Sequence, residues 1–195
     1  MFYMSYDASF CLVREIMQKP WVFISVILIL LWCEVSVAQS FPTPGPEHQA
    51  LKKLEGTWDV VMTMPGNIKA KGKMNSKMEC GGLWLMRDIE TKFRGLTMRS
   101  KILDGYDPVK RKHISVQFDS MSTVPMILEG EYDEANTTLT QTGEARDFDG
   151  SPEKVKSVLK QIDDDHQTVE VFRIYPDGKE AKHLTIEFAR SPDSK

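Results

Sequence analysis

Residues 69–78 read KAKGKMNSKM, and this stretch decides the fold class because two kinds of side chain alternate along it without a break. Every second residue is long and polar, and the residues between are small or apolar. Successive side chains of a β-strand point to opposite faces, so the pattern predicts a strand with one wet and one buried face. The buried face is expected to hold Ala70, Gly72, Met74, Ser76 and Met78.

The same two-residue period recurs in three other segments. The residues expected to face inward there are Trp58, Val60, Met62 and Met64; Ile114, Val116 and Phe118; and Leu184, Ile186 and Phe188. His113 and His183 fall on the opposite, outward side of this pattern. Weaker strand candidates lie near 83–93, 97–103, 124–132, 137–144, 154–162 and 167–175, with Gly, Pro, Asn and Asp between them. Such residues are typical of turns.

About ten strands in sequence, joined by short turns, favour one arrangement. No long helical segment separates the strands, so parallel βαβ units are excluded. We expect an all-β protein: an antiparallel up-and-down β-barrel, because closure removes the exposed edges of a sheet. A short helix is expected at 47–54, since Pro46 suits a first helical turn and Gly56 follows its end.

The N-terminal part of the chain has the features of an export signal. An apolar run from Trp21 to Trp32 follows Lys19 and precedes Ser36-Val37-Ala38. This is the order of a secretory signal peptide, so we expect cleavage after Ala38 and a periplasmic or secreted protein. An uncleaved apolar anchor is the alternative. Because Asp7 and Glu15 do not suit the start of such a signal, we expect Met17 to be the true initiator.

These boundaries divide the chain into four parts. The expected parts are a signal peptide at 1–38, a flexible leader at 39–46, a barrel domain at 47–190 and a tail at 191–195. Cys80 is then the one cysteine of the barrel, and we expect it to be a small buried residue. The formal net charge of −3 provides no basic face for nucleic acid. Any membrane contact is expected only through the export signal.

The first strand carries a signature of a known superfamily. Gly56-Thr57-Trp58 follows the predicted helix and resembles the Gly-x-Trp signature of lipocalins and other calycins. In that superfamily a basic residue of the last strand packs across the Trp and closes one end of the barrel. Arg190 is in phase with Phe188 and would be that residue here. The resemblance implies a structural role for Trp58 and Arg190.

A narrower resemblance extends over most of the predicted barrel. The segments His48-x-x-Leu51-x-x-Leu54-x-Gly56-Thr57-Trp58, Gly105-Tyr106-Asp107, Asp119 to Thr123, Glu129-Gly130-x-Tyr132-Asp133 and Asp177 to Glu180 occur in this order. Together they resemble the bacterial domain-of-unknown-function family 1579, over roughly residues 47–190. The resemblance implies a fold, but it implies no activity.

The expected inner face is rich in methionine. Met62, Met64, Met74, Met78, Met98 and Met126 fall on it, and flexible, polarizable side chains adapt to an apolar guest. Met74, Met98 and Met126 are therefore candidate ligand contacts. Small barrels use such an interior either to hold a ligand or to fill a solid core, and both alternatives stay open.

Arg173-Ile174-Tyr175 is the second candidate for ligand binding. A guanidinium and a phenol two residues apart resemble the carboxylate clamp of the intracellular fatty-acid-binding proteins, where such a pair binds an acid head group. The alternative is a solvent-facing pair, because this strand is the penultimate one and its inward face is ambiguous.

These features favour a binding protein for a small apolar or amphipathic molecule held in the lumen, with no cofactor. No catalytic motif is present in the sequence, and the four histidines lack the spacing of metal sites. An enzyme is the first alternative, with a site at the barrel mouth built from Arg87, Tyr106, Asp107 and Asp119. A solid-core interaction scaffold is the second. The pattern leaves the oligomeric state undetermined.

Overall fold

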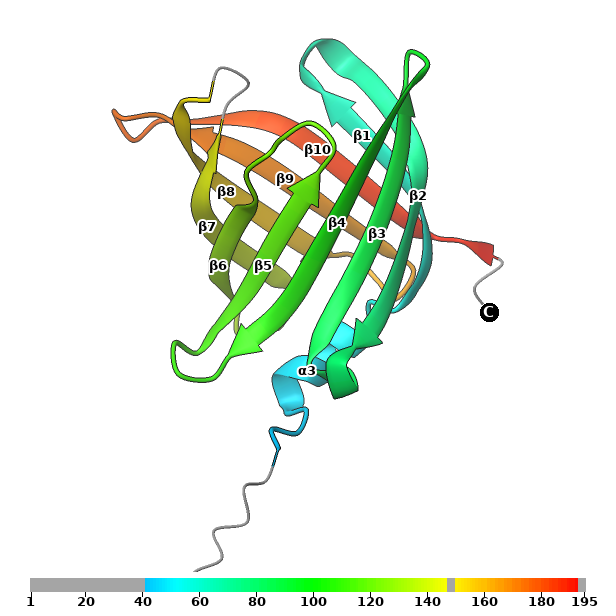
Figure 1. Ribbon diagram of the computed structural model, residues 1–195, viewed down its shortest axis with the longest axis vertical. Helices are drawn as coiled ribbons and strands as arrows, with labels where there is room; N and C mark the ends of the chain where they lie inside the picture. The colour runs from blue at the N-terminus through cyan, green and yellow to red at the C-terminus, as the bar shows by residue number, and fades with distance from the viewer. Residues whose placement is uncertain (1–40, 147–149, 193–195) are drawn as a thin grey trace, which may run out of the picture. The chain divides into compact units, whose positions relative to one another are not determined.

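A computed structural model describes residues 41–146 and 150–192, which form one helix, two short 3-10 turns and ten strands (Figure 1). The elements are α3 (Pro46–Lys52), β1 (Gly56–Met64), η1 (Pro65–Asn67), β2 (Ile68–Glu79), η2 (Cys80–Gly82), β3 (Trp84–Phe93), β4 (Leu96–Asp107), β5 (Lys112–Asp119), β6 (Met126–Tyr132), β7 (Thr138–Arg146), β8 (Pro152–Gln161), β9 (His166–Ile174) and β10 (Glu180–Arg190). The predicted signal peptide and its start at Met17 lie outside the described residues.

The ten strands form a closed antiparallel barrel. Each strand pairs with the next along the chain, and β1 also pairs with β10, where Trp58 lies opposite Arg190 and Thr63 opposite Thr185. The predicted up-and-down barrel with a short helix before its first strand is therefore confirmed. Over the ranges given above, no helix has the length and apolar character needed to cross a membrane.

Helix α3 covers one end of the barrel (Figure 1). Its residue Leu51 and the following Leu54 are fully buried against Leu85, at the start of β3, with Met78 at their side. The side chain of His48 accepts a hydrogen bond from the Gly45 amide at 3.0 Å, which holds the start of the helix. Burial of these leucines gives α3 most of its stability, since a seven-residue helix is marginal alone.

Trp58 and Arg190 are in contact next to this end. The guanidinium carbon lies 4.2 Å from the centroid of the Trp58 ring, and the indole Nε1 donates to the Leu54 carbonyl at 3.2 Å. Arg190 also donates to the carbonyl oxygens of Glu55 at 2.6 Å and Lys53 at 3.1 Å. The side chain thus joins the last strand to the segment between α3 and β1.

The apolar core occupies one side of the lumen. Trp58, Val60, Met74 and Phe188 are at most 4% exposed, and Ile89, Val169 and Ile186 pack against them. These residues come from β1, β2, β3, β9 and β10. On β1, β2 and β10 they belong to the faces predicted to point inward.

The inward face predicted for β5 is wrong. His113 and Ser115 are each 7% exposed and point into the barrel, whereas Phe118 is 47% exposed. Val116 lies in register with Leu103 of β4 and Ile127 of β6, so the apolar face of β5 joins a strip on the outer wall. Alternation shows that a strand has two different faces, but neighbouring strands decide which face is inside.

Candidate functional site

A cavity of about 600 Å³ lies at the end of the barrel opposite α3. Its apolar lining includes Met62, Met126, Val155, Val171, Leu184 and Ile186. Its polar lining includes Gln117, Asp119, Glu153, Arg173 and His183. The volume suits a small organic molecule, since ligand pockets in proteins span roughly 300–1,000 Å³. We refer to this space as the mouth cavity.

An ion pair is built into the cavity wall. Arg173 of β9 donates through Nε to Glu153 of β8, and their side chains are 29% and 14% exposed. The two strands are neighbours, with Val155 opposite Arg173 in the ladder. The guanidinium that was expected to bind a ligand acid is therefore already engaged by a carboxylate of the protein.

Tyr175 does not accompany Arg173 into the cavity. It lies beyond the end of β9, is 46% exposed and is not part of the lining. Of the three candidate methionines, Met126 lines the cavity, Met74 is buried in the apolar core, and Met98 is half-buried on β4 away from the lining. The structure therefore brings Arg173 and Met126 to one site and leaves Tyr175, Met74 and Met98 elsewhere.

His183 lies on the cavity side, contrary to the outward position predicted for it. The register of β9 and β10 shifts between Lys182 and Leu184, so His183 is the extra residue of a β-bulge. As a result, His183 and Leu184 both line the mouth cavity. A bulge interrupts the two-residue period, which is why strict alternation misplaced this side chain.

A buried polar network lies further down the lumen, on the wall formed by β3, β4, β5 and β7. Arg87 Nε is 2.7 Å from Asp104 Oδ2, and both side chains are less than 10% exposed. Ser115 donates to Asp104 Oδ1 at 2.5 Å, and its oxygen lies 3.1 Å from Gln141 Oε1. Gln141 Nε2 in turn donates to the His113 carbonyl at 3.3 Å.

Gly130 allows the strands of this network to approach. It lies between His113 and Gln141 in the β5–β6–β7 ladder. A Cβ at this position would lie 1.8 Å from the Thr140 carbonyl oxygen and 2.6 Å from Gln141 Cα. The missing side chain leaves room for the Gln141 amide to reach β5.

Aromatic rings continue the network toward α3. The His113 ring lies 5.1 Å from Tyr106 and 4.9 Å from Tyr132 between centroids, and Tyr106 lies 6.3 Å from His48. Burial lowers the pKa of His113, because the charged imidazolium loses its hydration, and burial raises the pKa of Tyr132. Both side chains are therefore held in their neutral forms at neutral pH.

Sequence reasoning missed this network because its β5 residues, His113 and Ser115, occupy a face that was assigned to solvent, and Arg87 was considered only for a site at the barrel mouth. The available signal was the in-phase polar series His113, Ser115, Gln117 and Asp119, all of which the structure turns inward. A polar face on a strand can point inward when other strands supply partners for it. Arg87 and Asp104 on β3 and β4 are such partners.

The four residues considered for an enzyme site do not converge. Asp119 lines the mouth cavity, Arg87 is paired with Asp104, and Tyr106 packs on His113. Asp107 accepts hydrogen bonds from the Val109 and Lys110 amides in the β4–β5 turn. In the part of the chain that the structure describes, no group of three or more His, Cys, Asp or Glu side chains could hold a metal ion.

Cys80 is exposed in the turn η2, so the expectation of a small buried residue is wrong. Its backbone has a φ of 51°, a conformation that turns favour over strand interiors. Nothing else about the thiol distinguishes it from an ordinary surface cysteine.

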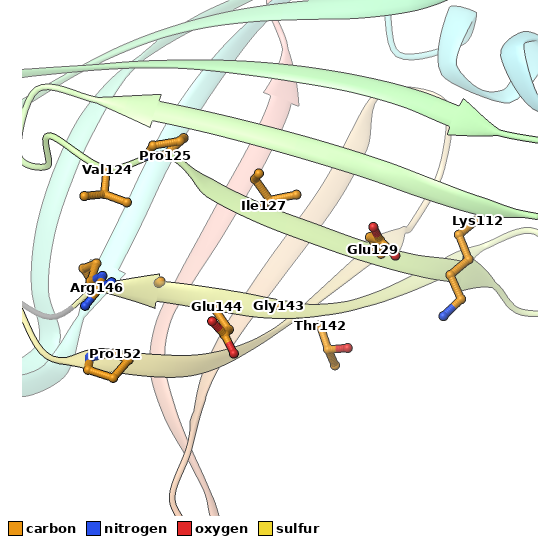
Figure 2. A pocket seen from close by; sticks show the side chains of 11 residues that line it. Lys112, Val124, Pro125, Ile127, Glu129, Thr142, Gly143, Glu144, Arg146 and Pro152 are labelled. Carbon is orange, nitrogen blue, oxygen red and sulfur yellow. The ribbon is translucent and has the colours of Figure 1, made fainter. Parts of the chain in front are cut away.

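A second hollow, of about 530 Å³, lies on the outer wall over β6 and β7 (Figure 2). Ile127, Val124 and Pro125 line it together with the charged residues Lys112, Glu129, Glu144 and Arg146. Glu129 is paired with Lys110. The mouth cavity is the stronger candidate, because inward side chains of seven strands converge on it.

Solved structures are similar to this chain. Rv2717c from M. tuberculosis is similar with a TM-score of 0.55 and 17% identity, over 75% of this chain and 98% of that one. A de novo designed fluorescence-activating β-barrel has a TM-score of 0.43 and 12% identity over 73% and 97% of the two chains. A redesigned barrel, b11L5F_LGL, has a TM-score of 0.42 and 15% identity over 73% and 95%. At 17% identity the likeness to Rv2717c shows the fold alone.

No curated protein matches the sequence. The family described as "Protein of unknown function (DUF1579)" matches residues 43–190, which are most of the chain and all of the barrel. The chain therefore belongs to the DUF1579 family.

Proposed function

We propose that this barrel binds a small amphipathic molecule in the mouth cavity. The observation that carries the proposal is the mixed apolar and polar lining of a space of about 600 Å³. Met62, Leu184 and Ile186 offer an apolar wall, and Gln117 and Asp119 offer polar groups on another strand. An apolar wall with a few placed polar groups is the usual composition of a small-molecule site.

The position of the two walls supports an amphipathic occupant. β5, which carries Gln117 and Asp119, is five strands from β10 in the ten-stranded ring, so these two polar residues face Leu184 and Ile186 across the lumen. His183 and the Arg173–Glu153 pair lie beside those apolar residues. Ile186 belongs both to the cavity lining and to the apolar core around Trp58 and Met74, so the core adjoins the cavity. A guest would bury its apolar part against β1 and β10 and direct its polar part toward β5.

We further propose that binding takes place outside the cytoplasm. The support is the apolar run from Trp21 to Trp32 and the small residues at 36–38, which have the order of a secretory signal. Detection of a mature N-terminus after Ala38 in the expressing cell, by mass spectrometry, would support export with cleavage. A retained N-terminus would favour the anchored alternative.

The binding proposal can be tested with Nile red, a neutral apolar dye whose fluorescence rises when it leaves water. We expect saturable binding to the protein, and binding at least about tenfold weaker in Leu184→Trp, which fills the cavity from its apolar wall. Phe118→Trp is the matched control, because it adds the same indole on the outer wall. Absence of saturable binding, or equal weakening by the two variants, would contradict the proposal.

A further inference from the structure

The charges inside the lumen limit which head groups the mouth cavity can accept. The two less exposed guanidinium groups of the inner wall have carboxylate partners: Arg87 is paired with Asp104, and Arg173 with Glu153. Arg146, which also lines the cavity, is exposed and donates to the Gly150 carbonyl oxygen at 3.0 Å. A carboxylic acid that paired with Arg87 or Arg173 would have to displace one of these protein carboxylates. It would then leave a partly buried carboxylate without its counter-ion, which is costly.

Asp119 differs from the paired carboxylates of Asp104 and Glu153. It is the last residue of β5, lines the mouth cavity and is half-buried. Its Oδ1 accepts a hydrogen bond from the Met121 amide at 2.7 Å. Among residues 41–146 and 150–192, no Lys, Arg or His forms an ion pair with its carboxylate.

The surroundings of Asp119 define the chemistry of a complementary guest. Gln117, two residues earlier on the same face, adds a second polar group. Across the lumen, Leu184 and Ile186 of β10 and Met62 of β1 are apolar. A molecule that spans this space meets a carboxylate at one side and these apolar side chains, with His183 beside them, at the other.

We propose that the occupant of the mouth cavity is an amphipathic cation, an amine with an apolar body, whose ammonium group pairs with Asp119. This inference rests on the proposed binding function and adds the charge of the ligand to it. It reverses the acid-binding role that the sequence suggests for Arg173 and Tyr175. An ammonium group at Asp119 gains a counter-ion that a carboxylate or a neutral alcohol does not have there.

The test compares three probes with the same apolar body: octylamine, octanol and octanoate, each displacing Nile red below its micelle-forming concentration. We expect octylamine to bind about five- to tenfold more tightly than octanol, as for a partly desolvated ion pair, and octanoate to bind most weakly. The advantage of octylamine should shrink at high salt, while octanol binding stays unchanged.

Asp119→Asn separates the charge from the structural role of this residue. Asparagine keeps an oxygen that can accept the Met121 amide hydrogen bond, so the end of β5 is preserved. We expect the affinity of octylamine to fall to that of octanol in this variant, while the affinity of octanol stays unchanged. Asp88→Asn, on the outside of β3, is the matched control and should change none of the three affinities.

Three results would overturn the inference. Octanoate could bind as tightly as octylamine, or Asp119→Asn could lower the affinities of all three probes equally. The third result is that none of the three probes displaces bound dye. Each of these presupposes that Nile red binds. If the dye itself shows no saturable binding, the proposed function fails first, so the two failures are distinguishable.

Discussion

Arg87 and Asp104 place opposite charges inside the barrel, where each depends on the other. The Arg87 Nε to Asp104 Oδ2 distance is 2.7 Å, and the two side chains are 7% and 8% exposed. Desolvation of two ions offsets much of their attraction, so the pair contributes little net stability compared with an apolar pair. Removal of one partner is different, because the remaining charge stays buried without compensation.

Asp104→Asn is therefore expected to lower the free energy of unfolding by about 3–5 kcal/mol. The double variant Arg87→Met/Asp104→Leu should recover most of this loss, since it buries no charge. Urea unfolding followed by tryptophan fluorescence measures all of these variants. Asp88→Asn, whose partner Lys101 is exposed, should cost less than about 1 kcal/mol. Equal losses in the single and double variants would contradict this account.

At the scale of the strand, β5 and β10 show how a regular pattern is set by its neighbours. β5 turns its polar residues inward because β3, β4 and β7 carry partners for them, and its apolar residues meet Leu103 and Ile127 outside. β10 keeps the predicted inward face at Ile186 and Phe188 but adds His183 through a bulge. Glycines on β2 and β6 then allow the strands to approach closely.

Gly130→Ala tests the close approach of β6 and β7. The added methyl group would meet backbone atoms at 1.8 and 2.6 Å, which cannot move without breaking the ladder. We expect a loss of about 3 kcal/mol or more in the free energy of unfolding, or failure to fold.

Gly95→Ala is the control for this prediction. It lies in the β3–β4 turn with a φ of 82° and no atom within 4 Å of an added Cβ, so only backbone strain of about 1 kcal/mol is expected. Similar losses in the two variants, measured by urea unfolding, would show that steric contact at β6 is not the cause.

At the scale of the whole molecule, closure between β1 and β10 removes every free edge from the sheet. The ladder from Trp58–Arg190 to Thr63–Thr185 occupies the backbone groups that an open sheet would expose. The Arg190 side chain adds the contact with Trp58 and bonds to the carbonyl oxygens of Glu55 and Lys53.

Hydrogen exchange tests this closure without any substitution. We expect the amides of β1 and β10 that pair across the closure to exchange as slowly as those between β4 and β5, because opening them requires opening the barrel. Amides of the exposed β9–β10 turn around Gly178 should exchange much faster. Fast exchange along β1 and β10, comparable with that turn, would mean that the barrel opens there.

The sequence by itself determined the number of strands, their order, the short helix before them and the inward faces of β1, β2 and β10. These follow from local periodicity and turn residues, which act between near neighbours in the chain. Tertiary structure alone decided that His113 and Ser115 face inward, that Arg87 pairs with Asp104, and that Arg173 is engaged by Glu153. It also decided that no cation of the described residues forms an ion pair with Asp119. Each of these depends on which side chains of distant segments meet across the barrel, and two-residue alternation contains no information about that meeting.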